Sequence, residues 1–268
     1  MSVMSFVEVG DIRIHYGLEG PTTAAVLVFS NSLGTDYFMW DPQAPVLKKK
    51  WRLLRYDTRG HGQTSVTPGP YSIERLGKDV LGLLDSLHLD RVHFCGLSMG
   101  GMIGMWLGAN ARERLNRLVL CNTAVKIGTA ETWNARIAAV QKNGMKPIAA
   151  AVIERWFTPA FRAKSPEIVS KAQHMLEQAN PEGYAACCAA VRDFDFRRKL
   201  GLIRVPTLAI AGSQDPATTP ADLHALADAI PRARYAELAA SHLSNIEDSS
   251  RFTAEVNAFL DERGGFDG

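Results

Sequence analysis

The chain has 268 residues, 46% of them hydrophobic, and is therefore long and apolar enough to build one large α/β domain or two small ones. Its net charge is +2, with basic and acidic residues interspersed, so we expect no nucleic-acid partner. No apolar stretch approaches the roughly 18 residues of a membrane span, and the amino-terminal residues lack a basic segment followed by an apolar one, so we expect neither a membrane span nor an export signal.

Eight short segments have the apolar or alternating composition of β-strands. In chain order they are Phe6–Val9, Ile12–Tyr16, Ala24–Ser30, Arg52–Tyr56, Val92–Leu97, Leu118–Cys121, Thr207–Gly212 and Arg234–Leu238. The first two flank Gly10-Asp11, a pair that suits a tight hairpin. The remaining strands alternate with segments of helical character.

Four helices are predicted between or after these strands. They run from about Ser72 to Leu87, from Ser98 to about Arg112, from Thr219-Pro220 onward, and near Ser250–Leu260. Buried strands that alternate with helices indicate a mostly parallel sheet. We therefore expect an eight-stranded sheet with helices on both faces.

The alternation stops between residues 123 and 200. Proline-marked helix starts at Lys146-Pro147, Ser165-Pro166 and Asn180-Pro181 predict three or four short helices there, and no strands. The chain thus divides into a core domain of residues 1–122 and 201–268 and a helical lid of residues 123–200. An insertion after the sixth strand is expected over the carboxyl ends of the parallel strands, where such sheets bind ligands.

The most informative motif is Gly96-Leu97-Ser98-Met99-Gly100, which lies between a predicted strand and a predicted helix. A G-x-S-x-G pattern in that context is typical of a nucleophile elbow, a tight turn that holds a serine hydroxyl out toward a base. The glycines are needed because larger residues would clash with the strand and the helix. The alternative is an ordinary serine in a turn.

A serine hydroxyl needs a base, and the base needs an acid to orient it. His242 lies in the loop between the last strand and the last helix, and Asp215 lies in the turn after the strand Thr207–Gly212. Proteins with such an elbow carry serine, acid and histidine in this chain order. The position after the sixth strand offers Asn122 and no acid, which favours Asp215. A buried loop histidine and an aspartate that caps its own turn are the alternatives.

Two backbone amides should stabilise the oxyanion of a tetrahedral intermediate. One is the N–H of Met99, which follows the serine, and the other is the N–H of Leu33 in the loop after the third strand. His61 is interpreted as a residue that fixes its turn, and the other five histidines as ordinary surface or edge residues.

The four cysteines form neither a disulfide framework nor a Cys-x-x-Cys metal pair. Cys95 and Cys121 fall in predicted strands, and Cys187 and Cys188 are adjacent in a helical segment. We interpret all four as small core residues of a reduced, cytoplasmic protein.

The elbow, the segment Tyr56-Asp57-Thr58-Arg59-Gly60-His61-Gly62 and the order of Ser98, Asp215 and His242 together resemble the α/β-hydrolase superfamily, over nearly the whole chain. The loop Asn31-Ser32-Leu33-Gly34-Thr35-Asp36 departs from the His-Gly pair of many members. In the insertion, Glu154–Pro159 and Tyr184–Asp193 look like segments of the 3-oxoadipate enol-lactonases, which act in the breakdown of aromatic compounds.

This resemblance implies hydrolysis of 3-oxoadipate enol-lactone to 3-oxoadipate through an acyl-enzyme on Ser98, with no cofactor. The expected partner is a small lactone that carries a free carboxylate. For that carboxylate the lid offers Trp133, Arg136 and Arg192, and Trp133 and Arg136 share a face if their segment is helical. The alternative for this pair is an apolar contact beside a solvated arginine.

Three other functions remain open. A general carboxylesterase or a cofactor-free perhydrolase of the haloperoxidase type would use the same three residues. A non-catalytic ligand receptor on the same fold is the third, because a fold alone does not fix function. The oligomeric state is not indicated by the sequence.

Overall fold

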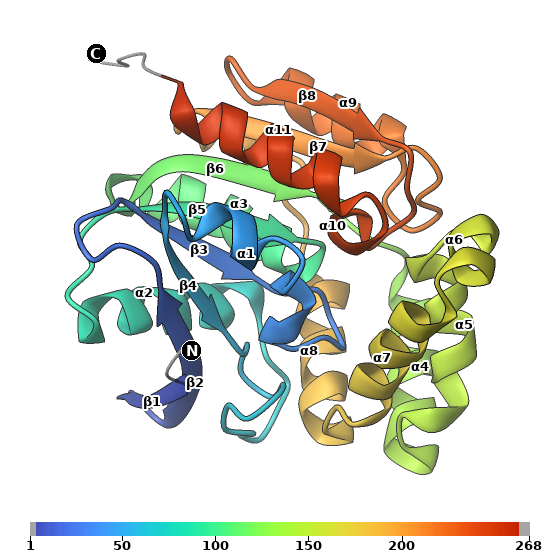
Figure 1. Cartoon of the computed structure of the whole chain (residues 1–268). Helices are drawn as coiled ribbons and strands as arrows, with labels where there is room; N and C mark the ends of the chain where they lie inside the picture. The colour runs from blue at the N-terminus through green and yellow to red at the C-terminus, as the bar shows by residue number, and fades with distance from the viewer. Residues whose placement is uncertain (1–3, 263–268) are drawn as a thin grey trace.

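The structure is a computed structural model, and it describes residues 4–262. Its centre is an eight-stranded sheet with the strand order β1-β2-β4-β3-β5-β6-β7-β8 (Figure 1). The strands are β1 (Met4–Val9), β2 (Ile12–Glu19), β3 (Val26–Ser30), β4 (Arg52–Tyr56), β5 (Val92–Leu97), β6 (Leu115–Cys121), β7 (Thr207–Gly212) and β8 (Arg234–Leu238). Only the pairs β1–β2 and β2–β4 are antiparallel, so the predicted mostly parallel sheet is confirmed.

Helices cover both faces of the sheet, as predicted (Figure 1). On one face lie α1 (Ala44–Leu47) and α11 (Ser249–Asp261), and on the other lie α2 (Ile73–Ser86), α3 (Met99–Asn110) and α9 (Pro220–Ala229). The short helix α10 (Ser244–Glu247) precedes α11, and three 3-10 helices cover Tyr37–Trp40, Arg112–Arg114 and Leu200–Leu202. Every residue of β3, β5 and β7 is buried, because helices cover these central strands on both faces.

The segment between β6 and β7 is helical throughout its regular structure. Its helices are α4 (Ala130–Asn143), α5 (Lys146–Trp156), α6 (Pro159–Lys164), α7 (Pro166–Glu177) and α8 (Pro181–Asp193). The expected three or four helices are therefore five, because α6 and α7 are separate. Thr158 caps α6 through its side chain, and Pro159 occupies its first turn. The division into a core domain and a lid domain stays a prediction.

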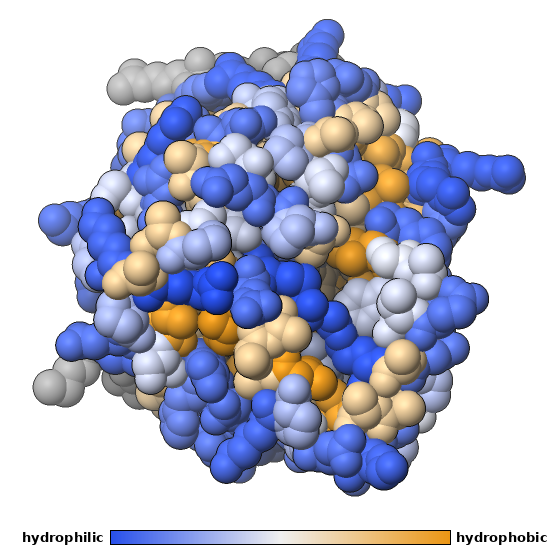
Figure 2. Space-filling view, turned by 90° about the vertical axis from the view of Figure 1, so that its right-hand side faces the viewer, coloured by the Kyte–Doolittle hydropathy of each residue, from blue (hydrophilic) through white to orange (hydrophobic). Residues whose placement is uncertain are grey.

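These five helices lie beyond the carboxyl ends of the parallel strands, at the right of Figure 1. Figure 2 views the molecule from that side and shows apolar residues in small groups among hydrophilic ones. Helices α4 and α8 pack against each other, and so do α5 and α7. The lid helices thus stand over the edge of the sheet at which β5 delivers Ser98.

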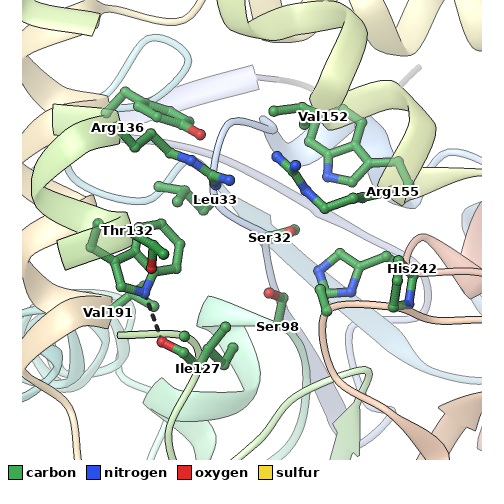
Figure 3. A pocket seen from close by; sticks show the side chains of 16 residues that line it. Ser32, Leu33, Ser98, Ile127, Thr132, Arg136, Val152, Arg155, Val191 and His242 are labelled. Carbon is green, nitrogen blue, oxygen red and sulfur yellow. Dashed lines mark hydrogen bonds between the residues drawn. The ribbon is translucent and has the colours of Figure 1, made fainter. Parts of the chain in front are cut away.

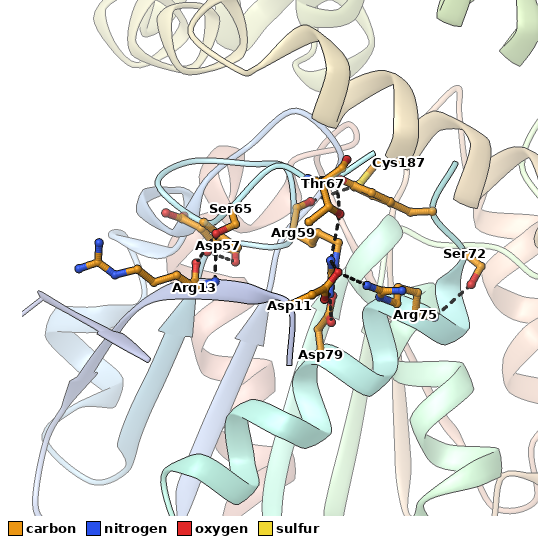
Figure 4. A network of polar contacts seen from close by, with 12 residues as sticks. Asp11, Arg13, Asp57, Arg59, Ser65, Thr67, Ser72, Arg75, Asp79 and Cys187 are labelled. Atoms are coloured by element: carbon orange, nitrogen blue, oxygen red, sulfur yellow. Dashed lines mark hydrogen bonds and ion pairs between the residues drawn. The ribbon is translucent and has the colours of Figure 1, made fainter. Parts of the chain in front are cut away.

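An ion-pair network centred on the buried Arg59 holds the turn that follows β4 (Figure 4). The Arg59 guanidinium donates two hydrogen bonds to the Asp79 carboxylate of α2, at 2.7 and 2.6 Å, and others to Asp11 and Thr67. A planar guanidinium suits such forked contacts. The network joins the β1–β2 turn, the β4 turn and α2.

All four cysteines are buried and free, as expected of core residues. Within residues 4–262, no helix is both long and apolar enough to cross a membrane. Residues 1–3, which belong to the segment in which we expect no export signal, lie outside the described residues.

Candidate active site

Ser98 stands in a strained turn between β5 and α3. Its backbone has φ 57° and ψ −112°, a conformation that residues with side chains rarely adopt. A Cβ atom at position 96 would lie 2.1 Å from the Gly100 carbonyl oxygen, and one at position 100 would lie 2.2 Å from the Ser30 carbonyl oxygen. Only glycine fits at either position, so the spacing of the motif follows from this turn.

His242 and Asp215 meet although 27 residues separate them. The His242 ring lies with Nδ1 2.7 Å from Oδ2 of Asp215, in a buried pair. Although burial of Asp215 disfavours its charge, the charge of His242 and hydrogen bonds from His242, Thr218 and Asn122 hold the pKa of the carboxyl to about 2. An ionised carboxylate at Nδ1 keeps the proton of neutral His242 on that nitrogen and leaves Nε2 free to accept one.

Asp215 also caps its own turn. Its Oδ1 accepts hydrogen bonds from the backbone N–H groups of Ala217 and Thr218, at 2.8 and 3.1 Å. The turn-capping alternative is therefore true, and it is compatible with the contact to His242 because the two roles use different carboxylate oxygens.

Asn122 is a residue of this cluster that the sequence did not reveal. Its side-chain N–H₂ donates to Oδ2 of Asp215 at 2.9 Å and to the Ser241 carbonyl oxygen at 3.2 Å. Its own Oδ1 accepts a hydrogen bond from the Ser244 hydroxyl. Asn122 thus fixes the carboxylate and the histidine loop together. Its position directly after β6, where we looked for an acid, was the available signal.

The loop after β3 is tied to the elbow. The N–H of Gly100 donates to the Asn31 carbonyl oxygen at 3.0 Å, and the Asn31 side chain is held by Trp40 and Tyr56. Leu33 is buried and lines the same pocket as Ser98, whereas Met99 is fully buried at the start of α3. The two segments predicted to supply oxyanion donors therefore lie against each other.

His61 reaches beyond its own turn. Its Nε2 accepts a hydrogen bond from the N–H of Gly34 at 3.0 Å, so His61 holds the loop after β3 as well. Burial lowers the pKa of His61, which keeps the ring neutral and Nε2 available as an acceptor.

Two of the other histidines are not surface or edge residues, and here our interpretation was wrong. His15 is buried because its Nδ1 lies 2.7 Å from Asp57 and the rings of Phe6 and Tyr37 pack on it. His93 is buried beside Trp51. The remaining three, His88, His174 and His224, are exposed.

A pocket of about 260 Å³ lies between the elbow and the lid (Figure 3). Ser98 and His242 line it from the core, together with Ser32 and Leu33. Its other lining residues include Ile127, Trp133, Arg136, Val152, Arg155, Trp156, Tyr184 and Val191. Its size suits a small molecule, and its lining combines apolar side chains with polar and charged ones.

Trp133 and Arg136 both line this pocket, but Arg192 does not. The Trp133 indole N–H donates to the Ile127 carbonyl oxygen at 2.7 Å, and the Arg136 guanidinium lies 4.8 Å from the indole centre. Arg192 instead contacts Asp193 and Asn134. The pocket also contains Arg155, which sequence reasoning did not single out.

The comparison with known families decides the classification. A family model described as "alpha/beta hydrolase fold" matches residues 25–249. The chain belongs to the α/β-hydrolase family. It is 45% identical to "3-oxoadipate enol-lactonase 2" of Acinetobacter baylyi, over 93% of this chain and 94% of that protein. It is 42% identical to "3-oxoadipate enol-lactonase 1" of the same organism, over 91% of each.

A solved structure agrees with these sequence relatives. The enol-lactonase from Burkholderia xenovorans LB400 is 45% identical and superposes with a TM-score of 0.95, over 96% of this chain and all of that one. The expected fold, the resemblance to the enol-lactonases and the classification as a carboxylic-ester hydrolase are confirmed.

Proposed function

We propose that this enzyme hydrolyses 3-oxoadipate enol-lactone to 3-oxoadipate in the breakdown of aromatic compounds. The observation that carries the proposal is the pocket, in which Ser98 and the Asp215-linked His242 face two arginines of the lid. The names of the relatives support the same substrate. A neutral ester has no group that would use those arginines, which favours the lactone over a general esterase substrate.

In the first step Ser98 attacks the lactone carbonyl. His242 takes the hydroxyl proton at Nε2, and ionised Asp215 stabilises the imidazolium that results. The N–H groups of Leu33 and Met99 would hold the oxyanion. The C–O bond of the ring then breaks, and the ring oxygen leaves as an enolate that the His242 imidazolium protonates to the enol. An enolate is a better leaving group than a simple alkoxide, and the enol tautomerises to the ketone.

In the second step water attacks the acyl-enzyme. His242 removes a proton from the water, the ester bond to Ser98 breaks, and the serine recovers its proton from the imidazolium. The second carboxylate of 3-oxoadipate is formed here. The residues named so far account for each proton transfer without a cofactor. In our proposal Trp133 and Arg136 contact the ring and its carboxymethyl arm.

Replacement of Ser98 tests this function. We expect Ser98→Ala to lower the rate of enol-lactone hydrolysis by about 10³-fold or more, because the nucleophile is lost. Circular dichroism and thermal unfolding should match the wild type. Retention of more than a few per cent of turnover by a folded variant would remove Ser98 as the nucleophile.

A further inference from the structure

The pocket carries positive charge and has no acidic side chain among its lining residues. Its lining residues include Arg136 and Arg155 but neither aspartate nor glutamate. In Figure 3 the two guanidinium groups point toward each other from α4 and α5, above Ser98 and His242. Burial, together with the charge of Arg136, lowers the pKa of Arg155. Two like charges in a partly desolvated space favour an anion between them.

The two arginines differ in their contacts. Arg136 lies over the Trp133 ring and beside the Tyr184 hydroxyl, whose pKa it lowers against the effect of burial. Among residues 4–262, the Arg155 guanidinium makes no ion pair and donates no hydrogen bond to another side chain, and the charge of the neighbouring Glu154 acts on it only from beyond ion-pair distance. A half-buried charge without a partner is costly unless a ligand supplies one.

The backbone of Arg155 is fastened to the histidine loop. Its carbonyl oxygen accepts a hydrogen bond from the Ser241 hydroxyl at 2.7 Å, and the next carbonyl, of Trp156, accepts one from the N–H of Leu243 at 3.0 Å. The Glu247 carboxylate completes the junction, because it accepts hydrogen bonds from the N–H of Ser241 and from Thr158. The residues on either side of His242 thus hold the carboxyl end of α5.

We infer that Arg155 is the specificity-determining residue of this pocket and binds the free carboxylate of an acidic substrate, which it shares with Arg136. This inference rests on the proposed function and names the group that selects the substrate. Because the backbone of Arg155 and the loop that carries His242 are held by one set of hydrogen bonds, the Arg155 side chain extends from a point that is fixed relative to the base. With its carboxylate on Arg155, the substrate has the length that brings its lactone carbonyl to Ser98.

Inhibition by a dicarboxylate tests the inference without the lactone. Adipate has the chain length of 3-oxoadipate, and adipamide is its neutral counterpart. Both are titrated as competitive inhibitors of p-nitrophenyl acetate hydrolysis by the wild type and by Arg155→Ala. We expect the inhibition constant of adipate to rise about 10- to 100-fold in the variant, because a charge-assisted contact is lost. The constant of adipamide should change less than about threefold.

Three further variants sharpen the result. Arg155→Lys should recover part of the affinity, since it keeps the charge but not the planar fork. In the double variant with Arg136→Ala, the combined loss should be smaller than the product of the single losses, because both arginines contact one carboxylate. Arg192→Ala is the matched control, since that lid arginine already contacts Asp193, and it should leave adipate inhibition unchanged.

The outcomes separate the inference from the function on which it rests. Equal changes for adipate and adipamide, or an equal effect of Arg192→Ala, would overturn the role of Arg155. Arg155→Ala should keep the melting temperature of the wild type, and a drop that accompanies equal losses would indicate a structural role instead. If the adipate pattern holds but the wild type does not consume the lactone, the anion site stands and the proposed substrate is wrong.

Discussion

Two arginine sites in this molecule use positive charge in opposite ways. The side chain of Arg59 is 1% exposed, and its guanidinium contacts the carboxylates of Asp79 and Asp11 and the hydroxyl of Thr67 (Figure 4). Arg155 lines the pocket with Arg136 and without a carboxylate (Figure 3). The first charge is balanced within the protein and holds three segments together. The second lies in the pocket beside Ser98, with no carboxylate among the lining residues.

The difference teaches where to look for binding energy. A buried ion pair with good geometry fixes the helices and turns that carry its two residues, but its charges are already paired and do not bind a ligand. An arginine that is half-buried and makes no ion pair has more to gain from an anion. In the Asp215–His242 pair the carboxylate likewise has its partner within the protein. His242 uses Nδ1 for this contact, lines the pocket and keeps Nε2 for the reaction.

The largest effect should come from the balanced pair inside the site. Asp215→Asn removes the charge that stabilises the imidazolium and can present an N–H to Nδ1, which favours the wrong tautomer of His242. We expect kcat for the lactone to fall about 10³- to 10⁴-fold, with KM nearly unchanged.

Steady-state kinetics measure this loss, and Asp222→Asn serves as the control. That aspartate belongs to the exposed capping box of α9 and should leave kcat unchanged. A decrease of less than tenfold for Asp215→Asn would show that Asp215 does not support the base.

The second effect concerns the Arg59 network, which stabilises the fold outside the pocket. Arg59→Met leaves the Asp79 carboxylate nearly buried without its partner, so the free energy of unfolding should fall by about 3 to 5 kcal/mol. Urea denaturation followed by circular dichroism measures it. The exposed Arg75, which also contacts Asp11, provides the control: Arg75→Met should cost less than about 1 kcal/mol.

The same variant sharpens the comparison of the two arginine sites. Under conditions in which Arg59→Met is folded, its preference for the acidic lactone over a neutral ester should match the wild type. A preference lost to the same degree as in Arg155→Ala would mean that the balanced charge also acts on the substrate.

The smallest effect concerns His93, a buried histidine of β5 that stays neutral. Burial and the charges of Arg117 and Arg91 lower the pKa of His93 to about 4, and its Nδ1 has no partner in the structure. The fold therefore opposes protonation. The stability that the neutral His93 ring contributes is complete above about pH 6.5, the pKa of histidine in the unfolded chain. It is lost as the pH falls toward about 4, the pKa of His93 in the folded protein.

Replacement of His93 measures how much this residue contributes to the loss of folding stability at acid pH. Between pH 7 and 4.5, we expect His93→Phe to lose about 2 kcal/mol less stability than the wild type. Urea unfolding at the two pH values measures the difference. Identical losses in the two proteins would show that His93 is protonated as easily in the folded state as in the unfolded one.

The sequence predicted features that depend on neighbouring residues. The elbow glycines and the strands follow from local spacing, and the chain order of Ser98, Asp215 and His242 indicated which loops to compare. Helix α6 was missed because its start at Thr158-Pro159 was not used as a signal. His15 and His93 were misjudged because their burial comes from rings that lie far away in the chain.

The hydrogen bonds that hold the site residues in place could not be predicted either, because they also join residues that lie far apart in the chain. The contact of Asn122 with Asp215 joins residues 93 positions apart, and the contact of Ser241 with Arg155 joins residues 86 apart. Arg155 has an ordinary place in a lid helix, and what distinguishes it is its position in a pocket that no carboxylate lines. The cytoplasmic location stays a prediction from composition.

The most direct test of the account compares two substrates of the wild-type enzyme. We predict that kcat/KM for 3-oxoadipate enol-lactone exceeds that for p-nitrophenyl acetate by about tenfold or more, because only the lactone carries a carboxylate for the arginines of the pocket. Nitrophenolate is the better leaving group, so chemistry alone would favour the acetate. Equal values, or a faster reaction with the acetate, would contradict the claim that this pocket is built for an acidic lactone.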